Sequence, residues 1–186
     1  TSTIRHASGV SCAEHECLMA AIGASLDVAS RDLFIKGMRQ VANSVAVVTT
    51  SGEAGRHGAT VSAFSSVSAD PPQILVCLRS ASRIATAVDA NNIFCLNVLS
   101  HQHPHLAERF SGSHDSAVSD RFHGVELHEA DGWVVLSGAT AFCCSISDRM
   151  TAGTHTIFIG HVQRLRTSSD EPLTYHQGRF RRLVQD

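Results

Sequence analysis

The chain has 186 residues, of which 43% are hydrophobic and 17% charged, and its formal net charge is −2 with neutral histidines. This composition excludes a disordered chain and fits one globular domain with a sizeable core. The near-neutral charge gives no electrostatic basis for nucleic acid or a membrane surface as the main partner, and no apolar run approaches the roughly 20 residues that a membrane-spanning helix needs.

The six cysteines do not form the pattern of a disulfide framework. Cys77 and Cys95 lie inside apolar runs, and Cys143 and Cys144 are adjacent, so that they face opposite sides of a strand. The first thirty residues also lack a basic start followed by an apolar block, so we expect no signal peptide. Together these features predict a reduced, cytoplasmic protein.

The chain opens with a weakly patterned lead-in, residues 1–29, in which only residues 16–24 suggest a short helix. Ser30 can cap a helix over residues 31–42, whose apolar residues share one face. The pattern then changes to that of strands, with turns at Asp131-Gly132 and Ser137-Gly138. The segments expected to be extended are 44–51, 59–68, 73–79, 93–100, two or three strands within 125–150, 154–167 and a closing segment 172–183.

Two more short helices interrupt the strands. Ser80 or Ser82 can cap a helix over residues 83–90, which Asn91-Asn92 ends, and a helix over residues 103–112 ends at Gly112 before a polar loop. Because strands predominate, we expect an α+β fold that is mainly β, a barrel or sandwich with short helical insertions.

One stretch is unusual for a strand. GATVSAFSSVSADPP, residues 58–72, is built from small and hydroxyl-bearing residues before two prolines end it. By itself, this pattern fits an ordinary edge strand with a polar outer face.

From this stretch onward the chain resembles the short-chain flavin reductases, NAD(P)H:flavin oxidoreductases that serve two-component monooxygenases. The resemblance covers about residues 31–184, and its motifs follow one another in order. They are GATVSAFSSVSADPPQILVCL, Ser80-Ala81-Ser82-Arg83, CLNVLS, LAERFSG, DRF at 120–122, GTHTIFIGHV at 153–162 and PLTYHQGRFRRL.

The resemblance implies an FMN-binding split β-barrel over residues 30–186, with the lead-in outside it, and usually a homodimer. It implies hydride transfer from the C4 atom of the nicotinamide to the N5 atom of FMN or FAD; we expect NADH as the donor, and NADPH is the alternative. Reduced flavin would then leave for a separate oxygenase. Two alternatives stay open: the same fold reducing another acceptor, such as a cobalt corrinoid or a ferric complex, or a flavin- or haem-binding module without turnover.

The resemblance also implies the site. A flat flavin ring needs a slim strand beside it, and hydroxyls and backbone N–H groups can meet the polar edge of the ring. The residues so assigned are Thr60, Val61, Ser62, Ala63, Ser65 and Ser66. Ser80, Ser82 and Arg83 precede a helix whose N-terminus favours phosphate, although a plain serine cap with a solvated arginine fits the same residues.

The remaining assignments are spread along the chain. Asn97, Phe110 and Gly153 are expected at the flavin, although backbone groups can also satisfy the buried amide of Asn97. Tyr175 and Arg179 are expected at the dinucleotide or the second subunit, or simply in a final strand with an exposed basic end. His155 is the candidate catalytic residue, with a positioning role, because hydride transfer needs no acid or base; a histidine bonded only to backbone is the competing interpretation. Cys12, His15 and Cys17, like the histidines at 101, 103 and 105, lack a standard zinc spacing, so we expect no functional metal.

Overall fold

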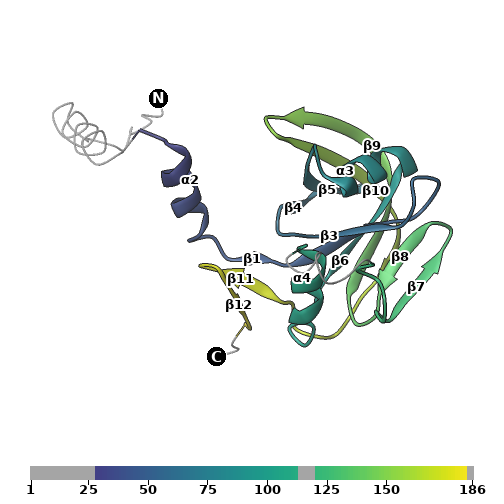
Figure 1. Ribbon diagram of the computed structural model, residues 1–186. Helices are drawn as coiled ribbons and strands as arrows, with labels where there is room; N and C mark the ends of the chain where they lie inside the picture. Colours follow the sequence, from purple (N-terminus) through teal and green to yellow (C-terminus); the bar gives the residue numbers. More distant parts are fainter. Residues whose placement is uncertain (1–27, 113–119, 184–186) are drawn as a thin grey trace, which may run out of the picture. The chain divides into compact units, whose positions relative to one another are not determined.

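The computed structural model describes residues 28–112 and 120–183 (Figure 1). The expected helix over residues 16–24 and most of the polar loop lie outside these residues. Helix α2 (Arg31–Met38) belongs to one unit of the chain, and residues from Arg39 onward form the other. Ser30 accepts a hydrogen bond from the Leu33 amide at 3.2 Å, as expected of a cap. No helix among the described residues is long and apolar enough to cross a membrane.

The second unit is built on an antiparallel sheet of seven strands. The strand order across the sheet is β3 (His57–Val61), β2 (Ala46–Thr50), β6 (Ile93–Val98), β9 (Thr140–Ala152), β10 (His155–Arg166), β5 (Pro72–Arg79) and β4 (Phe64–Ala69). The expectation of a mainly β chain with few, short helices is confirmed.

The single strand expected over residues 59–68 is wrong. The chain bends at Ser62 and Ala63, so that β3 pairs with β2 at one edge of the sheet and β4 pairs with β5 at the other. Two linking residues span at most about 11 Å between the strand ends. The sheet therefore curls until its two edges approach one another (Figure 1).

Strand β2 is buried on both faces, which explains its β-branched sequence. Ala46 and Val48 belong to one core, which helix α3 (Arg83–Asn91) helps to cover. Val47 belongs to the other core, which contains residues of helix α4 (Pro104–Phe110) and of the two-stranded sheet β7 (Leu127–Ala130) and β8 (Trp133–Leu136). The two helices therefore lie on opposite faces of the sheet.

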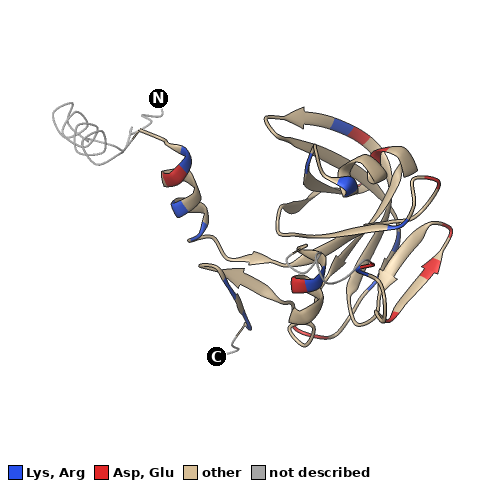
Figure 2. Ribbon diagram, in the orientation of Figure 1, with Lys and Arg blue, Asp and Glu red and all other residues tan. Residues whose placement is uncertain are grey.

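A small sheet of β1 (Asn43–Ser44), β11 (Thr174–His176) and β12 (Arg179–Arg181) closes the chain. The turns expected at Asp131-Gly132 and Ser137-Gly138 are confirmed: they join β7 to β8 and β8 to β9, with positive φ at Asp131, Gly132 and Gly138. Basic and acidic residues are spread over several helices, strands and turns of the described ribbon (Figure 2).

Candidate functional site

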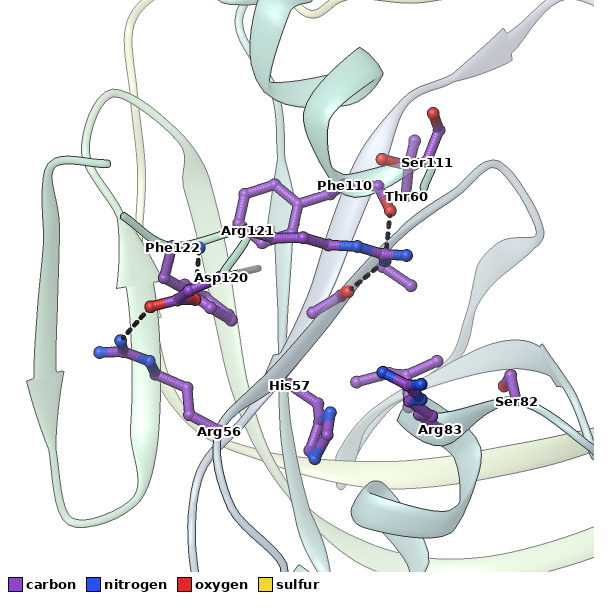
Figure 3. A pocket seen from close by; sticks show the side chains of 13 residues that line it. Arg56, His57, Thr60, Ser82, Arg83, Phe110, Ser111, Asp120, Arg121 and Phe122 are labelled. Atoms are coloured by element: carbon purple, nitrogen blue, oxygen red, sulfur yellow. Dashed lines mark hydrogen bonds and ion pairs between the residues drawn. The ribbon is translucent and has the colours of Figure 1, made fainter. Parts of the chain in front are cut away.

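A cavity of about 720 Å³ lies between strand β3, the start of α3, the end of α4 and the segment 120–122 (Figure 3). Its size falls within the range of small-molecule sites. The residues around it are Arg56, His57, Gly58, Ala59, Thr60, Ser82, Arg83, Ile84, Phe110, Ser111, Asp120, Arg121 and Phe122.

One wall of the cavity is the N-terminus of helix α3. Ser82 has an extended backbone, and its hydroxyl oxygen accepts a hydrogen bond from the Ala85 amide at 3.3 Å, which confirms it as the cap. The hydroxyl also donates to the Arg79 carbonyl at 2.6 Å, which fixes the side chain. The uncapped N–H groups and the positive dipole end favour an anion here, and Arg83 adds a guanidinium.

The lining of the cavity carries more positive than negative charge. It contains three arginines, Arg56, Arg83 and Arg121, and one carboxylate, that of Asp120. Arg56 lies 3.5 Å from Asp120 and 3.2 Å from Glu129, and its guanidinium sits 4.7 Å from the centre of the Phe122 ring. These contacts fix Arg56 at one side of the cavity, opposite Arg83 (Figure 3). The cavity is therefore suited to a ligand with a phosphate group.

Arg121 connects the two other walls. Its Nη1 atom donates to the carbonyls of Gly58 and Phe110, each at 3.0 Å. Phe110 is the last residue of α4, so the guanidinium also meets the negative end of that helix. Strand β3 is thereby attached to α4.

Strand β3 is slim where it lines the cavity. A Cβ atom on Gly58 would lie 2.7 Å from the Phe110 ring and 2.9 Å from the Phe122 ring, so only glycine fits without a shift. The Thr60 hydroxyl donates to the Ala107 carbonyl at 2.7 Å, and toward a ligand its oxygen is left to accept. A planar ligand with N–H groups along its edge would suit this wall.

The cavity brings together four of the residues expected from the sequence: Thr60, Ser82, Arg83 and Phe110. Ser80 lines a second cavity on the other side of α3. Val61 is the last residue of β3, Ser62 and Ala63 form the bend after it, and Ser65 and Ser66 are exposed on β4. None of the five is among the lining residues of either cavity.

The later assignments lie on other elements. Gly153 is in the turn between β9 and β10, and exposed His155 begins β10, with its Nδ1 atom 3.0 Å from the Thr154 hydroxyl. Tyr175 and Arg179 are exposed in the small sheet, where the Tyr175 ring meets Phe180 edge-on. None of these four residues lines either cavity.

Asn97, which was expected at the flavin, lies in the interior of the protein and lines neither cavity. Asn97 has no exposed surface, and its Nδ2 atom donates to Val47, Thr49 and Val134 at 3.0–3.3 Å. Its Oδ1 atom accepts from the Leu136 amide at 2.9 Å. The amide is thus satisfied inside the protein, where it joins the sheet to β8.

Sequence reasoning missed Arg56, His57 and Arg121 as lining residues. Arg121 stood in the DRF motif at 120–122, which was the one available signal. Among the described residues, no group of three or more His, Cys, Asp or Glu is arranged to hold a metal ion. The Cys12–His15–Cys17 motif lies outside the described residues.

The chain combines a curled antiparallel sheet with a cavity at a helix N-terminus that is suited to a phosphorylated small molecule. Residues 38–184 match the family described as "Flavin reductase like domain". The chain therefore belongs to the flavin reductase-like family.

Named relatives agree with this assignment. The chain is 36% identical over 165 residues to "FMN reductase (NADH) RutF 2" of Methylorubrum extorquens, covering 88% of this chain and 95% of that protein. It is 35% identical to the "4-hydroxyphenylacetate 3-monooxygenase reductase component" of Salmonella typhimurium, covering 79% and 88%. The solved structure of the Streptomyces globisporus NADH:FAD oxidoreductase SgcE6 "in complex with NAD and FAD fragments" superposes with a TM-score of 0.78 at 26% identity, covering 87% of this chain and 99% of that one.

Proposed function

We propose that the protein is an NADH-dependent flavin reductase that reduces FMN or FAD and supplies reduced flavin to a separate oxygenase component. The observation that carries the proposal is the cationic cavity between β3 and the N-terminus of α3, in a chain of the flavin reductase-like family. Its relatives include one named as an NADH-dependent FMN reductase and one named as the reductase component of a monooxygenase.

The residues of the cavity fit a flavin. The N–H groups at the start of α3, with Ser82 and Arg83, would hold its phosphate. Gly58 leaves room for the rings of Phe110 and Phe122, which line the cavity, and the Thr60 oxygen can accept from a ring N–H group of the flavin. When bound, the flavin supplies the hydride acceptor, and the protein binds and orients it. His155 would position the dinucleotide, because hydride transfer needs no protein acid or base.

We also propose a split β-barrel fold, a homodimer and a cytoplasmic location. The two-residue link between the edge strands supports a split β-barrel within residues 30–186. A homodimer would cover part of the exposed apolar surface, to which Val67 on β4 contributes. The four described cysteines are free thiols, a usage typical of the cytoplasm. Light scattering on the purified protein tests the dimer.

The decisive experiment is an NADH oxidation assay with FMN, FAD and riboflavin compared. Loss of NADH absorbance that depends on added flavin is the expected result. Oxidation that needs a cobalt corrinoid or a ferric complex instead of free flavin would assign another acceptor. Tight flavin binding without NADH oxidation would reduce the protein to a binding module and overturn the proposal.

A further inference from the structure

A second cavity, of about 290 Å³, lies between helix α3 and the β9–β10 hairpin. Hydroxyl groups make up much of its lining, and Ala85, Met150 and Phe158 give it an apolar part. The Ser80 and Thr156 hydroxyls are 2.9 Å apart, and Thr156 pairs across the hairpin with Thr151. The hydroxyl-bearing residues around it are Ser80, Thr86, Thr151 and Thr156. This lining suits a ligand with both hydroxyl groups and an apolar face.

The two cavities lie on opposite sides of the first turns of α3. Ser82, Arg83 and Ile84 line the first cavity, and the next residues of the helix, Ala85 and Thr86, line the second. Hydride transfer requires the reacting atoms to approach to about 3–3.5 Å, so the nicotinamide must enter the cavity that holds the flavin. The other end of the dinucleotide then needs a second place on the protein, and the second cavity lies beside the next residues of the same helix.

One ion pair dominates the charge of the second cavity. Arg149 donates through Nη1 to the Asp89 carboxylate and through Nη2 to Asn92 Oδ1, the latter at 2.9 Å. Asp89 and Arg149 both line the cavity, and their side chains are 54% and 43% exposed. The guanidinium is therefore engaged by protein acceptors, and the pair as a whole adds no net charge.

This arrangement bears on the choice between NADH and NADPH. An acidic side chain beside the adenosine ribose accepts from the 2′-hydroxyl of NADH, whereas a free arginine accommodates the 2′-phosphate of NADPH. Here the carboxylate neutralises the arginine, and a 2′-phosphate would meet the negative charge of Asp89.

We propose that the second cavity holds the adenosine ribose of the nicotinamide dinucleotide and that the Asp89–Arg149 pair excludes a 2′-phosphate. This inference rests on the proposed function and adds to it the determinant of dinucleotide preference. Removing the charge of Asp89 releases Arg149 to bind the phosphate, and removing Arg149 leaves the carboxylate to repel it.

The test compares Asp89→Asn and Arg149→Met with wild type, using kcat/KM for NADH and NADPH at saturating flavin. Asp89→Asn raises the NADPH-to-NADH ratio about tenfold, since a charge-assisted hydrogen bond is gained. Arg149→Met lowers the ratio below that of wild type. Asp131→Asn is the matched control: it removes a carboxylate 3.9 Å from Arg164, in an exposed pair away from both cavities, and leaves the ratio unchanged.

Calorimetric titration with 5′-AMP and adenosine 2′,5′-bisphosphate tests the site without turnover. Asp89→Asn is expected to bind the bisphosphate about tenfold more tightly than wild type and to bind 5′-AMP with unchanged affinity. The inference is overturned if Asp89→Asn keeps the wild-type NADPH-to-NADH ratio of kcat/KM and the wild-type affinities for 5′-AMP and the bisphosphate. If Asp89→Asn does not fold, a wild-type NADPH-to-NADH ratio in Arg149→Met overturns the inference. A wild-type protein that oxidises neither dinucleotide with any flavin would instead refute the proposed function.

Discussion

The Thr60 hydroxyl donates a 2.7 Å hydrogen bond to the main-chain carbonyl of Ala107, which joins strand β3 to helix α4 across one wall of the first cavity. The same carbonyl accepts from the Ser111 amide at 3.1 Å, so it keeps one partner if the hydroxyl is lost. Because β3 and α4 both line the cavity, this bond links the stability of the fold to the shape of the site.

Thr60→Val is expected to lower the free energy of unfolding by about 1 kcal/mol, the net value of one hydrogen bond. It also removes the oxygen that can accept from the flavin, so flavin affinity falls as well. Thr60→Ser keeps the hydroxyl and is the matched control. Urea unfolding and a flavin fluorescence titration measure the two effects; equal flavin affinity in the Val and Ser variants would contradict the role at the ligand.

Gly58→Ala is expected to destabilise the protein by about 1–3 kcal/mol, because the added methyl group would overlap the rings of Phe110 and Phe122. The two rings must move away from the added methyl group. Because both rings line the cavity, we expect this movement to narrow it and to weaken flavin binding. Gly37→Ala is the control, since no atom lies within 4 Å of its added carbon. Thermal unfolding of both variants checks the prediction, and a stable Gly58→Ala protein with normal flavin affinity would argue against it.

How far the sequence predicts the fold depends on whether the signal is local. The β-branched run around β2 and the serine cap of α3 are local features, and both were predicted. The bend at Ser62-Ala63 was not predicted. It arises because β3 pairs with β2, whereas β4 pairs with β5 at the other edge of the sheet. Residue periodicity carries no information about such a change of partner.

The same limit applies to the candidate site. Ser82 and Arg83 were found because a helix start can be recognised in the sequence. Arg121 meets Gly58 only after the chain has folded, 63 residues away, and no spacing reveals that contact. For Asn97, the sequence shows only that a polar residue in an apolar strand needs a hydrogen-bond partner. It does not show that strand β8 supplies that partner in place of a flavin.

Asn97→Ala is expected to cost about 2–3 kcal/mol of stability, since buried groups on strands β2 and β8 lose their partner. The folded fraction should bind flavin with wild-type affinity. Asn91→Ala is the matched control: Asn91 also bonds through both amide atoms, to Thr50, Gly55 and Ala54, but is only half-buried, so its loss costs less. Urea unfolding ranks the two. A flavin affinity that falls in the folded Asn97→Ala protein would restore a ligand role.

Arg83→Ala is expected to weaken FMN binding about tenfold and to leave riboflavin binding unchanged, because only FMN carries the phosphate that the guanidinium would meet. Arg79→Ala is the control, since Arg79 lies outside both cavities. Fluorescence titration of both flavins gives the affinity ratio. An Arg83→Ala protein with the wild-type ratio would exclude Arg83 as the phosphate ligand.

Burial among the core residues raises the pKa of the Cys144 thiol to about 12, from an ordinary value of 9.0. Below pH 9 this thiol is protonated in the folded and the unfolded chain. Between pH 9 and 12 only the unfolded chain loses the proton, so stability falls as the pH rises, by up to about 1.4 kcal/mol per pH unit. Cys144→Ala removes this contribution: the variant is less stable at pH 8, but its free energy of unfolding declines less steeply between pH 9 and 11. Other alkaline titrations are common to both proteins and cancel in the difference, so parallel curves in urea unfolding would refute the assignment.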